Sequence, residues 1–129
     1  MNFYHHQLKN GIRIVHKKTS SAVAHCGLII KGGSRNESEK EQGLAHFIEH
    51  VIFKGTSKRK AYHILCRMED VGGELNAFTT KEETCIYSSF LPEYYNRALE
   101  LLSDITFSSI FPKKELEKEK IVVLDEINY

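Results

Sequence analysis

His46-Phe47-Ile48-Glu49-His50 is the stretch of sequence around which the rest of the chain can be interpreted. In an α-helix, residues i and i+4 share a face, so the imidazoles of His46 and His50 can reach one ion with Glu49 beside them. At about 100° per residue Phe53 joins this face, and the opposite face carries apolar Leu44, Phe47, Ile48 and Val51. The stretch therefore predicts a helix with one packing face and one face that offers two of the three protein ligands of a catalytic zinc.

Two histidines four residues apart are more often exposed or hydrogen-bonded than bound to a metal. Glu49 changes this interpretation, because a carboxylate beside two histidines is what a zinc hydrolase needs to deprotonate water. His-x-x-Glu-His is the inverzincin pattern, the reverse of the commoner His-Glu-x-x-His. We therefore expect His46 and His50 to bind zinc, with the third ligand supplied from elsewhere in the chain.

The helix that Pro112 opens carries two candidates for the third ligand. Glu119 and Glu126 are seven residues apart and lie on the apolar stripe that contains Leu116, Val123 and Ile127. Carboxylates on such a stripe need partners. One interpretation places both at the rim of the helix, paired with Lys118 or Lys120. The other makes one of them a zinc ligand and leaves the second to orient an imidazole or hold substrate, without choosing between them.

The remaining pattern predicts an α+β domain: an antiparallel sheet with helices packed mainly on one face. We expect a hairpin of residues 4–8 and 12–17 around Asn10-Gly11, a central strand over 22–31, and a second hairpin of 75–80 and 84–91, all in one sheet. The zinc helix should end after Phe53 with Gly55 as its C-cap. Ser57 should cap a second helix that stops at Gly72-Gly73, and Pro92 should open a third.

Composition excludes several functional classes. The 129 residues carry 18 basic and 17 acidic side chains without a basic stripe, so nucleic acid is not expected as a partner. We expect no membrane partner and a cytoplasmic location by default, because neither a membrane-spanning run nor a secretory leader is visible. The three cysteines, Cys26, Cys66 and Cys85, are widely spaced and indicate reduced, buried thiols rather than a disulfide framework.

With these motifs in view, the sequence resembles the insulinase and pitrilysin peptidases, which include the mitochondrial processing peptidases. The resemblance runs almost from end to end. The matching stretches are Leu8-Lys9-Asn10-Gly11, Gly33-Ser34-Arg35-Asn36-Glu37, Gly43-Leu44-Ala45 with the zinc motif, Phe53-Lys54-Gly55-Thr56, Gly72-Gly73-Glu74-Leu75-Asn76-Ala77-Phe78-Thr79, Glu82 with Thr84, and Glu119 to Glu126.

The resemblance implies a zinc endopeptidase with one zinc per chain. It implies zinc ligation by His46, His50 and Glu126, with Glu49 as general base and Glu119 as the supporting carboxylate. It also implies that Asn76, Ala77 and Phe78 lie on an edge strand to which an extended peptide or unfolded polypeptide substrate adds as a further strand. Main-chain hydrogen bonds then hold the peptide, so loose specificity is expected.

The family is built from homologous halves that close around the substrate, and the second half supplies arginine and tyrosine side chains. Residues 1–129 are therefore expected to form part of an N-terminal catalytic domain, to need a homologous C-terminal half or partner subunit, to be weakly active alone, and to self-associate. One alternative is a noncatalytic structural or partner-activating subunit, whose usual signature is a damaged motif. Another is a metal-independent sheet domain that binds proteins through its open edge.

Overall fold

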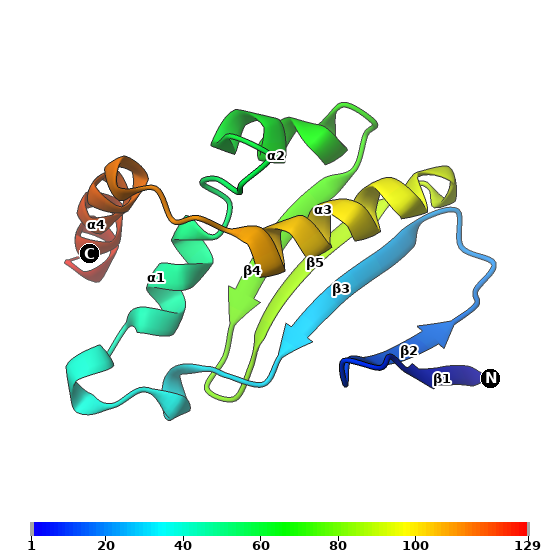
Figure 1. Cartoon of the computed structure of the whole chain (residues 1–129), viewed down its shortest axis with the longest axis horizontal. Helices are drawn as coiled ribbons and strands as arrows, with labels where there is room; N and C mark the ends of the chain where they lie inside the picture. Colours follow the sequence, from blue (N-terminus) through cyan, green and yellow to red (C-terminus); the bar gives the residue numbers. More distant parts are fainter. Residues whose placement is uncertain (1, 129) are drawn as a thin grey trace.

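The computed structural model describes residues 2–128, and this part of the chain is an α+β fold, as predicted. It contains two antiparallel sheets and four α-helices (Figure 1). In chain order the elements are β1 (Phe3–Gln7), β2 (Arg13–Lys17), β3 (Ala24–Ile30), α1 (Leu44–Val51), α2 (Ala61–Glu69), β4 (Glu74–Thr79), β5 (Thr84–Phe90), α3 (Tyr95–Ser108) and α4 (Lys113–Ile127).

The larger sheet has the strand order β3-β5-β4, so β5 is its central strand. Residue 24 pairs with residue 90 at one side of β5, and Asn76 pairs with Tyr87 at the other. The prediction of a central strand at residues 22–31 is wrong, because β3 is an edge strand of this sheet. The apolar run of β3 had suggested a buried strand, but Ile29 in it is 67% exposed. In β5, by contrast, five of the seven residues are buried. The prediction that β4 is an edge strand is confirmed.

The core lies between this sheet and its helices. Helix α3 packs on β3 and β5, while α1 and α2 contact β4 (Figure 1). Helical spacing places Ala98, Leu101, Leu102 and Ile105 of α3 on one face, and all four are almost fully buried. Residues of α2, β5 and the turn after α1 complete the core: Ile52, Ile64, Met68, Ile86 and Phe90. The helices therefore pack mainly on one face of the sheet, as predicted.

The N-terminal hairpin forms at the predicted position but does not join the larger sheet. Strands β1 and β2 pair only with each other among the described residues, from Phe3 with Lys17 to Gln7 with Arg13. All ten residues of the two strands are exposed. The hairpin and α4 lie at opposite ends of the molecule (Figure 1).

Helix boundaries differ from the predictions at two points. Helix α1 ends at Val51 rather than Phe53, and Gly55 does not cap it but forms a β-bridge with Lys60. Helix α2 begins at Ala61 with Lys60 at its N-cap, so Ser57 is not the cap. The cause is tertiary: the chain between the helices is tied to residues after α3, where the Ile110 N–H donates to the Gly55 carbonyl and the Ser57 N–H to the Ser108 carbonyl.

The loop before α1 is fixed to the β4–β5 turn. The backbone N–H groups of Ser34 and Arg35 donate to the carbonyls of Thr80 and Lys81, and Arg35 forms an ion pair with Glu82. Gly33 makes this approach possible, since a Cβ atom there would lie 2.2 Å from the Thr80 oxygen. The Glu37 carboxylate then accepts a hydrogen bond from the Ala45 N–H at 3.2 Å, in the first turn of α1.

All three cysteines are free thiols, as expected. Cys85 is buried and the other two are half-buried. Burial raises the pKa of Cys26 and Cys85, which disfavours the reactive thiolate. Across residues 2–128, no helix combines the length and the apolar character needed to cross a bilayer.

Candidate metal centre

Helix α1 brings His46 and His50 together as one turn of helix requires. Gly43 precedes the helix with a φ of +89°, a left-handed conformation that glycine adopts without a Cβ penalty. The two imidazoles meet edge to face with ring centroids 4.6 Å apart, and their Nε2 atoms are 3.1 Å apart. Both histidines thus direct the same ring nitrogen to one point beside α1.

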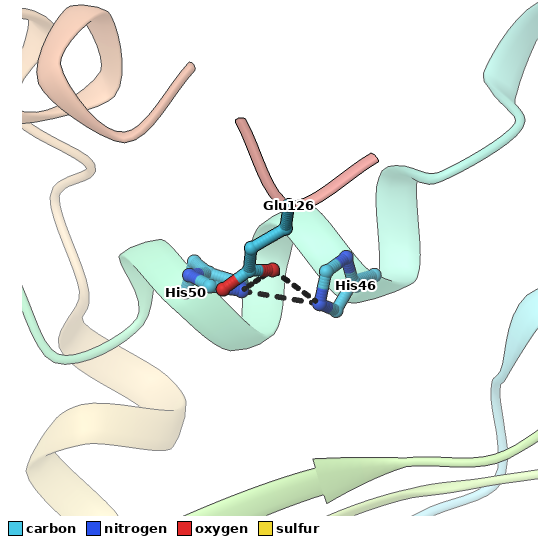
Figure 2. A group of neighbouring side chains, drawn as sticks. All are labelled: His46, His50 and Glu126. Atoms are coloured by element: carbon cyan, nitrogen blue, oxygen red, sulfur yellow. Dashed lines mark hydrogen bonds and ion pairs between the residues drawn. The ribbon is translucent and has the colours of Figure 1, made fainter. Parts of the chain in front are cut away.

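Helix α4 packs on α1 and adds a carboxylate at this point. Glu126 Oε2 lies 3.3 Å from Nε2 of His50 and 3.6 Å from Nε2 of His46, and Figure 2 shows the carboxylate directed at both rings. Tetrahedral zinc with bonds of about 2.0–2.2 Å places its ligand atoms about 3.3–3.6 Å apart. The three observed separations of 3.1, 3.3 and 3.6 Å therefore fit one zinc ion bound by two nitrogens and one oxygen.

Glu119 lies on the other side of His50. Its Oε2 is 3.3 Å from His50 Nδ1, and its Oε1 is 3.1 Å from Lys54 Nζ. The Glu119 side chain is only 12% exposed, against 50% for Glu126. A carboxylate that accepts from Nδ1 fixes the proton there and leaves Nε2 for a metal. Lys118 and Lys120 pair instead with Glu115 and Glu117, so they are not the partners of Glu119 or Glu126.

A cavity of about 260 Å³ opens beside the histidines, between α1, α4 and strand β4. Its lining consists of Glu49, His50, Phe53, Lys54, Asn76, Ala77 and Glu119. Within residues 2–128 the Glu49 carboxylate has no hydrogen bond or ion pair, although it lines this cavity. The cavity is thus lined by the carboxylate of Glu49, by the candidate ligand His50 and by residues of the edge strand β4.

The structure gathers most of the predicted site residues but not all. His46, His50 and Glu126 converge, and Glu119 contacts one of them. Asn76 and Ala77 line the same cavity as Glu49, and the Asn76 Oδ1 accepts a hydrogen bond from the Ala77 N–H at 2.9 Å. Phe78 lies apart from the cavity lining: it is 44% exposed, and its ring centroid is 5.9 Å from that of Tyr87.

Sequence reasoning assigned no role to two residues that support this centre. Lys54 lines the cavity and pairs with Glu119, and its spacing of four residues from His50 was the available signal. Glu37, whose carboxylate accepts a hydrogen bond from the first turn of α1, could not be found by periodicity because it lies in the irregular loop before that helix.

This chain is similar to known proteins in both sequence and structure. The family model described as insulinase (peptidase family M16) matches residues 13–129. An uncharacterized zinc protease of Bacillus subtilis, YmxG, is 46% identical over 92% of this chain and 29% of its own length. The mitochondrial-processing peptidase subunit beta of Bos taurus is 40% identical over 93% of this chain and 24% of its own length.

The fold agrees with this assignment. The crystal structure of a protease from Helicobacter pylori matches 97% of this chain and 30% of that protein with a TM-score of 0.93 and 29% sequence identity. The chain thus spans less than a third of the length of each of these relatives. The match to the family model over residues 13–129, with these relatives, shows that the chain belongs to the insulinase family of peptidases, which includes zinc proteases.

Proposed function

We propose that this chain carries the zinc-binding part of an endopeptidase that hydrolyses peptide bonds with water. The observation that carries the proposal is the convergence of the His46, His50 and Glu126 ligand atoms within 3.1 to 3.6 Å of one another. One zinc per chain is proposed at this point. Three protein ligands leave the fourth position open, which is the arrangement of catalytic rather than structural zinc.

Bound zinc would act as a Lewis acid on the scissile carbonyl and lower the pKa of a coordinated water. Glu49 is the proposed general base, because its carboxylate lines the cavity without a partner among residues 2–128. It takes the proton of the attacking water and later gives it to the leaving amine. His46 and His50 act as neutral ligands, and Glu119 holds His50 through Nδ1.

The proposed substrate is an extended peptide or unfolded polypeptide that adds to the free edge of β4. Asn76 and Ala77 lie on this edge and share the cavity with Glu49, so a strand paired there runs past the general base. Phe78 adds an exposed apolar ring next to Tyr87 for a substrate side chain. Main-chain pairing gives affinity with little demand on sequence, so we propose broad specificity.

We further propose that residues 1–129 form part of an N-terminal catalytic domain that acts with a homologous C-terminal half or with a partner subunit. The relatives that match this chain are more than three times as long. The alternative is a noncatalytic subunit of the same family. The convergence of His46, His50 and Glu126, and a Glu49 carboxylate without a partner among residues 2–128, support the catalytic proposal over it.

The substitution Glu49→Gln tests the proposal in the complete polypeptide that the gene encodes. It keeps the shape of the side chain and removes the base. Zinc content measured by elemental analysis should remain at one per chain, while hydrolysis of a quenched extended peptide should fall by at least about 100-fold. Glu69→Gln, an exposed site on α2, is the matched control and should leave both unchanged. Undiminished turnover by a zinc-loaded Glu49→Gln protein would refute the role of Glu49.

A further inference from the structure

We propose that Lys54 is a positioning residue of the metal centre. Its ammonium group fixes the Glu119 carboxylate, and that carboxylate in turn fixes the ring of His50. The inference rests on the proposed function, because it takes His50 as a zinc ligand. Lys54 itself is not proposed to touch zinc or substrate.

The contacts form one continuous line. Lys54 Nζ lies 3.1 Å from Glu119 Oε1, and Glu119 Oε2 lies 3.3 Å from His50 Nδ1. Each oxygen of the carboxylate therefore has its own partner. With Lys54 in place, Glu119 cannot rotate without breaking its ion pair with Lys54, whose charge offsets the cost of covering the carboxylate.

Burial makes this contact important. The side chains of Glu119, His50 and Lys54 are 12%, 19% and 29% exposed. A carboxylate this well covered is costly without a cation, and a neutral imidazole supplies none. Lys54 is the lysine or arginine that pairs with Glu119 among residues 2–128. Without it we expect Glu119 to move toward water or toward the metal ligands, and His50 to lose its fixed orientation.

Helix geometry explains why Lys54 is in reach. After α1 ends at Val51 the chain continues to turn, with Ile52 N–H donating to the Ile48 carbonyl and Lys54 N–H to that of Val51. His46, His50 and Lys54 therefore follow one another along the side of α1 that meets α4. Glu126 and Glu119, seven residues apart on α4, lie opposite them. The basic residues on the α1 side therefore face the acidic residues of α4.

The experiment measures zinc affinity by competition with a chromophoric chelator. Lys54→Met should weaken zinc binding by about 10-fold, the lower end of the cost of losing an outer partner of a metal ligand. Lys54→Arg, which keeps a cationic donor, should restore most of the affinity. Lys120→Met removes the same charge from an exposed site next to Glu119, where the lysine pairs with Glu117, and serves as the control.

The direction of the effect separates positioning from simple electrostatics. Removing a positive charge near a cation site should strengthen zinc binding if charge alone matters. A loss of affinity in Lys54→Met but not in Lys120→Met therefore supports positioning. In a Glu119→Gln background the Lys54→Met substitution should add nothing, because both act through one carboxylate. Unchanged affinity in Lys54→Met, or an equal loss in the Glu119→Gln background, would overturn the inference.

A second measurement does not depend on zinc. Nitrogen-15 NMR of the metal-free protein reports which ring nitrogen of His50 carries the proton. We expect the proton on Nδ1 in the unaltered protein and a mixture of tautomers in Lys54→Met. A protein that binds no zinc would contradict the proposed function, whereas the tautomer of His50 would still decide the role of Lys54: the same tautomer in both proteins would overturn it.

Discussion

At the scale of residues, the two nitrogens of His50 organise the site. Nε2 faces His46 and Glu126, and Nδ1 faces Glu119. Helical periodicity alone identified both histidines and Glu49, and it placed both glutamates on one stripe of α4. It could not choose between the glutamates, because residues seven apart share a face. The family resemblance implied Glu126, and the crossing of α4 over α1 supports that choice, because it brings the Glu126 carboxylate to the Nε2 atoms of both histidines.

Matched substitutions of the two glutamates test the distinction. Glu126→Gln should weaken zinc binding more than Glu119→Gln, because the first removes a charged ligand and the second removes the partner of a ligand. Loss of an outer partner costs about 10- to 100-fold in metal affinity, and loss of the ligand should exceed that. Chelator competition on the two variants gives both values. The reverse order would mean that Glu119 is the ligand.

His50→Ala gives an independent check of the same ligand set. Only His46 and Glu126 would remain, and two protein ligands hold zinc poorly in a site that keeps its fourth position open. Stoichiometric zinc should therefore be lost on dialysis. His63→Ala, an exposed histidine on α2, is the control and should retain zinc. If His50→Ala kept one zinc per chain, the ligand assignment would be wrong.

At the scale of elements, local signals predicted most of the fold. The hairpin of residues 75–80 and 84–91, the third helix after Pro92 and the fourth helix after Pro112 are all found where the sequence indicated. The predictions that were wrong concern which elements lie next to one another in space. An apolar run shows that a strand can be buried but not which strand is central, so β3 was misplaced. The connection between α1 and α2 is hydrogen-bonded to residues 108 to 110, at the end of α3 and just after it. Contacts between segments so distant in sequence leave no local pattern.

Gly33 and Gly32 form a matched pair for testing the loop that leads into α1. A Cβ at Gly33 would clash with the Thr80 oxygen and with the Lys81 backbone, whereas at Gly32 nothing lies within 4 Å. Gly33→Ala should therefore lower the free energy of unfolding by about 1–3 kcal/mol, the usual cost of overpacking. Gly32→Ala should change it by less than about 0.5 kcal/mol. Denaturant unfolding measures both, and equal stability of the two variants would contradict this view of the loop.

At the scale of the whole molecule, the site lies at one end of a partly covered sheet. Both edges of the larger sheet, β3 and β4, are unpaired within residues 2–128, and large apolar side chains are exposed on α4, among them Ile121, Leu124 and Ile127. Such surfaces suit further strands, another domain or a second copy. The three proposed zinc ligands all lie in this chain, whereas we propose that the walls of a substrate chamber are supplied from outside residues 1–129.

Residues 1–129 expressed alone should therefore be a weak peptidase, whatever their zinc content. Binding zinc and accepting a proton need only the residues of α1 and α4, but rapid hydrolysis also needs donors placed where the oxyanion develops and walls that hold the peptide in register. Of the cavity lining, Lys54 is the lysine or arginine, and it is engaged by Glu119. The cavity thus lacks a free cationic donor among the described residues.

A quenched extended peptide provides the assay. The zinc-loaded chain is compared with the full-length Bacillus subtilis zinc protease, and then with itself after addition of the remaining residues of that relative as a separate polypeptide. We expect slow turnover by the chain alone and a clear increase on mixing, because we propose that the added polypeptide supplies further donors and walls around the substrate. Zinc-dependent turnover by residues 1–129 alone at the rate of the full-length relative would show that α1, α4 and the edge of β4 suffice for catalysis.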